Sequence, residues 1–283
     1  MNNQSLTTFS AKDIEETQPA MKIGLLATVT PEGLPHLTLI SSLMACDSKK
    51  LCFGQFTEGM SKKHILGDPK VGFLIMSMNK ELWSGKASYT HFSKEGPEFE
   101  YYNNVPMFRY NAYFGVHTVY YLDLVSQSGK SPLPMNQVIF AAVRTMLART
   151  LGRKPGKQVV LNDWTRAFLN KLDNLKFLSY IDADGYPVII PAIQTQSLDS
   201  QHAIYSTSVY KNELENIPTG SDLCVFSMAL TMEDVLLRGR YLGIRRVVGV
   251  RAGVVKIDWV YNPMPPVPGQ VYPPVELKTI TEF

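Results

Sequence analysis

Apolar runs and turn residues occur in the same order twice along the chain. Ile23 onward reads IGLLATVTPEGLPHLTLISSL, and Lys176 onward reads KFLSYIDADGYPVIIPAIQTQSL. Each stretch has an apolar run, an acidic residue followed by Gly, then x-Pro and a second β-rich run. An acidic–Gly pair between two such runs is typical of a β-hairpin, because Gly accepts the positive φ of the turn. We therefore expect one hairpin at Gly33 and a matching one at Gly185.

The correspondence between the two halves continues downstream. Residues 51–78 (LCFGQFTEGMSKKHILGDPKVGFLIMSM) correspond in sequence to residues 203–230 (AIYSTSVYKNELENIPTGSDLCVFSMAL). In both, a strand ends at a hydroxyl residue, a short helical segment carries a Lys, and a Pro closes it. Further on, LWSGKASY (82–89) matches LLRGRYLG (236–243). Landmarks in one shared order predict an internal duplication, two diverged copies of one module.

Each half is interpreted as three strands, a short helix and three more strands. This pattern predicts a mainly β fold, with two tandem six-stranded antiparallel barrels and peripheral helices. We expect helices over 10–17, 136–151 and 163–173, the second from its apolar residues at helical spacing. The predicted organisation is a first module over 1–128, a helical linker over 129–162, a second module over 163–262 and a Pro-rich extended tail over 263–283.

Length and composition fit this organisation and exclude several classes of protein. The 283 residues suit two domains, and a formal charge of +3 is too small to indicate nucleic-acid binding. No apolar stretch approaches the roughly 18 residues of a membrane helix, and the polar, acidic start does not fit a signal peptide. The three Cys and five His lack ligand spacing. We expect a cytoplasmic protein with no metal, nucleic-acid or membrane partner.

The segment Thr57-Glu58-Gly59-Met60-Ser61-Lys62-Lys63 carries the most chemistry. It lies where a strand gives way to a helix, so hydroxyls, backbone N–H groups and two ammonium groups can converge on one anion. Such a cradle suits a phosphate monoester. The same residues also fit a plain helix cap beside two solvated lysines. In the second half the segment reads STSVYKN (206–212). Tyr210 stands at the position of Ser61 and Asn212 at that of Lys63, so we expect weak or no phosphate binding there.

A strand-Thr-x3-Ser-Lys-Lys-helix after the third strand of a six-stranded barrel resembles the FMN-binding split-barrel family, that of pyridoxamine 5′-phosphate oxidase and the flavin reductases. The resemblance covers 20–128 and, more loosely, 163–262. It implies that the fold is a tandem split barrel and that the FMN phosphate is held by Thr57, Ser61, Lys62 and Lys63. It also implies contacts beside the flavin ring from the second strand and the fifth strand, near Thr38, Ser41, Ser42, Ser84 and Lys86.

The chain departs from this family at its end. The oxidase has a C-terminal Arg-x-His motif that binds its substrate, and in this chain no His follows His202. The resemblance therefore implies an FMN-dependent oxidoreductase of the pyridoxamine 5′-phosphate oxidase-like family with an unknown small-molecule substrate. Open alternatives are a non-catalytic flavin or planar-ligand binder, a structural split-barrel protein, or a deazaflavin- or haem-binding relative. The barrels pair either within one chain or in a homodimer.

Overall fold

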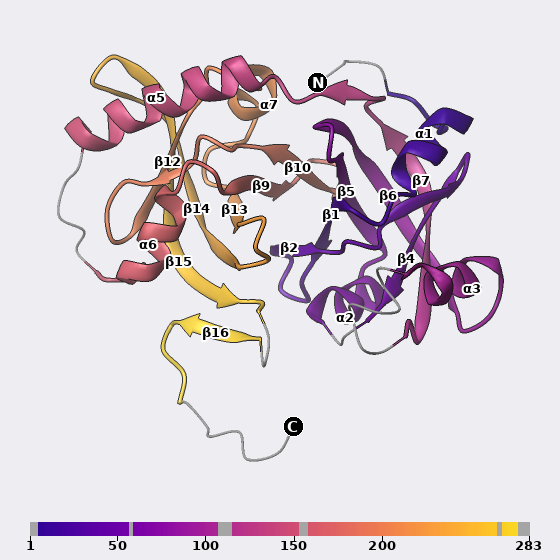
Figure 1. Ribbon diagram of the computed structural model, residues 1–283. Coiled ribbons are helices and arrows are strands. Elements are labelled where there is room, and N and C mark those ends of the chain that lie inside the picture. Colours follow the sequence, from indigo (N-terminus) through magenta and orange to yellow (C-terminus); the bar gives the residue numbers. More distant parts are fainter. Residues whose placement is uncertain (1–4, 57–58, 107–114, 153–157, 265–267, 277–283) are drawn as a thin grey trace. The chain divides into compact units, whose positions relative to one another are not determined.

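The computed structural model describes residues 5–56, 59–106, 115–152, 158–264 and 268–276. It divides into two compact units, the first Met1–Pro134 with Ser179–Ile189 and the second Met135–Leu178 with Ile190–Phe283 (Figure 1). Two eight-stranded antiparallel sheets form the framework of the structure, which confirms a mainly β fold in two tandem modules. Within the described residues, no helix is both long enough and apolar enough to cross a membrane.

The first sheet has the strand order β2-β1-β5-β6-β7-β4-β3, and β8 pairs with β6. Its strands are β1 (Lys22–Val29), β2 (Pro35–Leu39), β3 (Met44–Asp47), β4 (Lys50–Gln55), β5 (Lys70–Ser77), β6 (Glu81–Ser93), β7 (Thr118–Gln127) and β8 (Ser131–Pro132). The helices beside it are α1 (Ala11–Thr17), α2 (Met60–Gly67) and α3 (Pro97–Asn104).

The second sheet has the order β10-β9-β13-β14-β15-β12-β11, and β16 pairs with β15. Its strands are β9 (Leu175–Ile181), β10 (Pro187–Pro191), β11 (Gln196–Ser197), β12 (His202–Ser206), β13 (Asp222–Met228), β14 (Asp234–Val247), β15 (Val250–Asn262) and β16 (Gly269–Tyr272). The accompanying helices are α5 (Met135–Gly152), α6 (Asp163–Asn170) and α7 (Lys211–Glu215).

The main path of each sheet is the same permutation of strands in chain order, as a duplication predicts. The two turn glycines also match: Gly33 has φ 74° and Gly185 has φ 83°, the left-handed region that Gly enters without strain. The helices expected over 10–17, 136–151 and 163–173 correspond to α1, α5 and a slightly shorter α6.

Each sheet has two more strands than the six expected. One is β8 or β16, which pairs with β6 or β15, and the other is β3 or β11, which pairs with the following strand across a tight turn. Asp47 Oδ1 accepts a hydrogen bond from the Lys49 backbone N–H (2.6 Å) between β3 and β4. Asp199 Oδ1 does the same for Gln201 (2.7 Å) between β11 and β12. Asp favours such turns by bonding backbone two residues on. An Asp-Ser pair at each turn is thus a further landmark of the repeat, one that the sequence interpretation missed.

The core of the first unit shows that its sheet curls. Leu26 on β1 belongs to the same buried cluster as Phe53 on β4, although three strands lie between β1 and β4 in the sheet order. Phe73 and Trp83 complete the centre of this cluster, and Ile65 adds the inner face of α2. One apolar interior therefore holds both ends of the sheet and seats α2 against it.

Candidate anion-binding site at the start of helix α2

Helix α2 begins after Gly59, its N-cap residue, which is extended (φ −144°, ψ 163°) and has no side chain with which to cap the first turn. Ser61 is buried in that turn, Lys62 is half-buried and Lys63 is exposed. The first turn of a helix carries partial positive charge, so an anion there is favoured over a cation. Thr57, the first residue of the predicted cradle, lies outside the described residues.

The Ser61 hydroxyl contacts a second predicted site residue. Ser61 Oγ lies 2.5 Å from Thr38 Oγ1 on β2, a hydrogen bond in which either hydroxyl can donate. Because each hydroxyl has one hydrogen and the pair uses only one of them, a second hydrogen stays available to an acceptor. Thr38 is half-buried, whereas Ser61 is only 3% exposed. The structure thus brings Thr38 and Ser61 together, and Lys62 and Lys63 follow Ser61 on α2.

A buried polar layer below this pair fixes α2 on the sheet. His64 Nδ1 lies 3.0 Å from Thr28 Oγ1 on β1. The His64 ring also meets the His36 ring edge-on, with centroids 4.9 Å apart. His36 and Thr38 alternate onto one face of β2, and Ser61 and His64 are three residues apart on α2. These two histidines were missed as neighbours of the site, and the spacing of 36 with 38 and 61 with 64 was the available signal.

Ser41 and Ser42 lie in the turn after β2, and Ser42 has a structural role. Its Oγ donates to the Gly54 carbonyl (3.0 Å) and accepts from the Gly54 N–H (3.1 Å) on β4. The Tyr102 hydroxyl donates to the Ser42 carbonyl (2.7 Å) from α3. The Ser42 side chain is therefore engaged in joining the turn to β4, while Ser41 beside it is half-buried.

Ser84 and Lys86 lie on β6, three strands along the sheet from Thr38. The register shows this directly, because Thr38 pairs with Leu26, Leu26 with Phe73, and Phe73 with Gly85. The α2 cradle and the β6 residues are therefore not neighbours within the sheet. Ser84 Oγ contacts Ser128 Oγ at 3.2 Å.

The Lys86 ammonium is held by two carboxylates of the same unit. Lys86 Nζ lies 2.8 Å from Asp182 Oδ2 and 2.7 Å from Asp184 Oδ2. Burial alone would lower the pKa of Lys86, but hydrogen bonds and charge from Asp182 and Asp184 outweigh it and raise that pKa. Lys86 therefore stays protonated with its charge already balanced, which leaves less attraction for a ligand anion.

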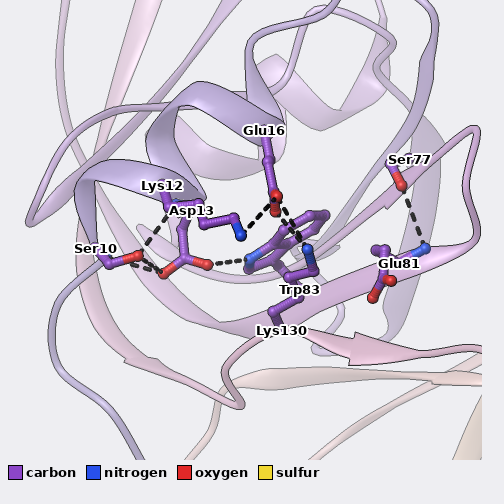
Figure 2. Close-up of polar contacts among 8 residues, drawn as sticks. All are labelled: Ser10, Lys12, Asp13, Glu16, Ser77, Glu81, Trp83 and Lys130. Carbon is purple, nitrogen blue, oxygen red and sulfur yellow. Dashed lines mark hydrogen bonds and ion pairs between the residues drawn. The ribbon is translucent and has the colours of Figure 1, made fainter.

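A second polar cluster in the first unit anchors α1 (Figure 2). Trp83 Nε1 donates to Asp13 Oδ1 (2.8 Å), and Lys130 Nζ pairs with Glu16 Oε2 (2.8 Å). Burial tends to raise the pKa of Asp13, but hydrogen bonds from Ser10 and Trp83 prevail and lower it. A cavity of about 400 Å³ opens beside Trp83, and none of the predicted site residues lines it. Since the charges here are paired, this cluster docks the helix.

Comparisons with known proteins give likenesses of structure only. No family model matches the chain, and no curated protein matches its sequence. HupZ of Group A Streptococcus is 14% identical, with 42% of this chain and 91% of that chain covered and a TM-score of 0.35. An FMN-binding protein of Syntrophomonas wolfei is 12% identical, with 43% and 88% covered and a TM-score of 0.34. An F420 reductase is 16% identical, with 42% and 97% covered and a TM-score of 0.33.

At such identities and TM-scores the fold is established by the strand order and register of this chain. The structures to which this chain is similar are FMN-binding and pyridoxamine 5′-phosphate oxidase-like split-barrel proteins, at low sequence identity.

Proposed function

We propose that the first unit binds the phosphate of FMN at the start of α2 and that the protein is a flavin-dependent oxidoreductase. One observation carries the proposal: the Thr38–Ser61 hydroxyl pair lies at the first turn of a helix that has Gly59 as its N-cap residue and also bears Lys62 and Lys63. These groups supply hydrogen-bond donors and positive charge for a phosphate monoester. Thr57 completes the proposed cradle by the family resemblance.

The residues present fit the phosphate end of the cofactor best. The helix turn, the spare hydroxyl hydrogen and the two ammonium groups all favour a dianion. On the ring side, Ser42 and Lys86 are engaged by Gly54 and by Asp182 and Asp184. For Ser42 or Lys86 to contact the flavin ring, either backbone atoms would make the contact or the side chain would give up an existing partner. The ring-side assignments of Ser41, Ser84 and Lys86 stay predictions.

The division of labour between protein and cofactor follows from these groups. A bound flavin supplies hydride and electron transfer, for which the protein need provide only binding, orientation and tuning. Ser61 and the two lysines hold one end of the ligand. Thr28, His36 and His64 keep α2 in place on the sheet, so the donors keep a fixed position.

Titration of FMN into the full chain, followed by flavin fluorescence, tests the binding step. We expect one saturable site, weakened at least about tenfold when Lys62 and Lys63 are replaced by Ala, because a hydrogen bond to a charged group contributes roughly 1.5–3 kcal/mol. The exposed Lys49 and Lys94, replaced together by Ala, form a control with the same change in net charge. Equal loss in both double variants, or no binding by the wild type, contradicts the proposal.

Steady-state assays separate the oxidoreductase from a non-catalytic flavin binder. Protein loaded with FMN should oxidise a reduced nicotinamide in the presence of an artificial electron acceptor, faster than free FMN at the same concentration. Saturable FMN binding without such turnover favours a sensor or storage role. Stronger binding of a deazaflavin than of FMN would assign a deazaflavin as the cofactor and leave the assignment of the phosphate site unchanged.

A further inference from the structure

The second unit contains a cavity of about 360 Å³ where four elements meet: the end of β12, the start of α7, helix α5 and the β14–β15 hairpin. Its lining includes Arg144 from α5, Lys211 from α7, and Arg246 and Arg251 from the two strands of the hairpin. Cavities that hold small molecules commonly measure about 300–1,000 Å³. Since a water molecule takes about 30 Å³ in the liquid, this cavity has room for more than an isolated ion.

The charge of this cavity is strongly positive. Glu215 is the acid in its lining, and it is paired, with its Oε1 lying 3.0 Å from Arg251 Nη2 and 3.2 Å from Arg251 Nε. Across the described part of the chain, no carboxylate is within ion-pair distance of Arg144, Lys211 or Arg246. Four cations against one carboxylate leave three positive charges to be balanced. An anionic ligand would supply that balance.

An independent feature of the hairpin points the same way. Arg246 and Arg251 are directly opposite each other in the antiparallel ladder of β14 and β15. Like charges in this position repel and destabilise the sheet. A ligand anion bound by both guanidinium groups would offset the repulsion.

Helix α5 is fixed so that Arg144 reaches this cavity. The neighbouring Thr145 is fully buried; its Oγ1 accepts a hydrogen bond from the Ser206 N–H (2.9 Å) and donates to the Ala141 carbonyl (2.9 Å). This contact joins α5 to the end of β12. There Ser206 Oγ lies 3.0 Å from Ser208 Oγ, so the floor of the cavity holds two hydroxyls beside the cations.

We infer that this cavity binds a phosphorylated small molecule, with Arg144, Lys211, Arg246 and Arg251 on its phosphate or diphosphate group. Guanidinium groups match phosphate oxygens in geometry as well as in charge. The segment 206–212 corresponds to the 57–63 cradle of the first unit, and it has Tyr210 and Asn212 in place of Ser61 and Lys63. The positive charge lost there is replaced by arginines from outside the segment. This site is separate from the proposed FMN site.

Calorimetric titration with pyrophosphate tests the inference in the full-length chain. All variants carry Lys62→Ala and Lys63→Ala, which removes the candidate site of the first unit, so the two proposals fail or succeed separately. In this background we expect one saturable site. Arg246→Gln should weaken it at least about tenfold, the loss expected of one charge-assisted hydrogen bond.

Arg245→Gln is the matched control, because Arg245 is equally exposed, has the same charge, and alternates onto the other face of β14 outside the cavity lining. It should change the affinity by less than about twofold, since its exposed charge lies on the opposite face of the strand and is screened by solvent and salt. Absence of saturable pyrophosphate binding in the Lys62→Ala, Lys63→Ala background overturns the inference. Equal weakening by Arg245→Gln and Arg246→Gln also overturns it, because that result would mean unspecific attraction to a basic surface.

Discussion

The hydroxyl oxygens of Thr38 and Ser61 lie 2.5 Å apart, and this contact joins strand β2 to the first turn of helix α2. The two residues are separated by more than twenty positions in the chain and by a change of secondary structure. Their pairing gives Ser61 a defined orientation. It also places a hydroxyl from the sheet beside the helix turn that carries Lys62 and Lys63.

Removal of this hydroxyl pair should reduce FMN affinity more than it reduces stability. Ser61→Ala takes away one donor to the phosphate, and we expect about tenfold weaker binding with a loss of about 1 kcal/mol in the free energy of unfolding. Thr17→Val is the matched control, because the buried Thr17 hydroxyl docks helix α1 through the Ala45 N–H and the Ile14 carbonyl and belongs neither to the proposed site nor to the groups that hold α2. It should lower stability by about 1–3 kcal/mol and leave FMN affinity unchanged in the folded protein. If Ser61→Ala lowered stability and left FMN affinity unchanged, Ser61 would serve only to dock the helix.

Lys22 should give the protein a stability that rises with pH in the alkaline range. Burial lowers the pKa of Lys22 to about 8, and its Nζ donates to the Pro19 carbonyl (2.8 Å) after α1. Between this value and the ordinary value near 10.4, the unfolded chain binds a proton that the folded chain does not. Stability therefore increases by up to about 1.4 kcal/mol per pH unit across that window.

Urea unfolding of wild type and Lys22→Met at pH 7 to 10 measures this slope. As pH rises, the free energy of unfolding of the wild type should increase relative to that of Lys22→Met. Lys176, at the start of β9, contacts the Lys171 carbonyl after α6, and its burial lowers its pKa to about 8 as well. A parallel effect is therefore expected of Lys176→Met. A pH-independent difference for both variants would show that these lysines stay charged when folded.

Asp234 should contribute a change of the opposite sign below neutral pH. Burial raises the pKa of Asp234 to about 7, and its Oδ1 has no hydrogen-bond partner among the described residues. Between pH 4 and 7 the folded chain binds a proton that the unfolded chain does not, so stability falls as pH rises. Asp234→Asn should stabilise the protein by about 2 kcal/mol at pH 8 and change little near pH 4. Thermal unfolding at the two pH values decides, and equal effects at both would contradict the assignment.

The Arg246–Arg251 pair should cost stability when no anion is bound. We expect Arg246→Gln to raise the free energy of unfolding by up to about 1 kcal/mol in dilute, phosphate-free buffer, because it removes a cross-strand repulsion. The gain should disappear in concentrated sodium chloride, which screens exposed charges. Arg245→Gln faces Ala252 across the ladder and should show no such gain. Destabilisation by Arg246→Gln in dilute buffer would contradict the repulsion.

The repeated pattern of turns and apolar runs was sufficient to predict the two modules. Gly33 and Gly185 mark matching hairpins because a positive φ leaves a local signature in the sequence. The short strands β3 and β11 escaped prediction, since two to four residues show no periodicity. Their turns could have been predicted from Asp47 and Asp199, each followed by Ser.

The sites were harder to predict because their residues come from distant parts of the chain. Position-by-position comparison of 57–63 with 206–212 showed that the second copy loses positive charge. It could not show Arg144, Arg246 and Arg251, which reach that segment from another helix and another hairpin. Nor could spacing reveal that Asp182 and Asp184 already balance Lys86. Such contacts depend on packing between elements, which sequence periodicity does not encode.

The visible absorbance spectrum of the purified full-length chain is the most direct test of FMN binding by the first unit. It is recorded as purified, and again after incubation with FMN and removal of the free cofactor. We predict flavin bands at about one FMN per chain by the second step, retained by the Lys49→Ala, Lys94→Ala control and lost when Lys62 and Lys63 are replaced by Ala. A colourless chain that retains no FMN after incubation would contradict the proposed function.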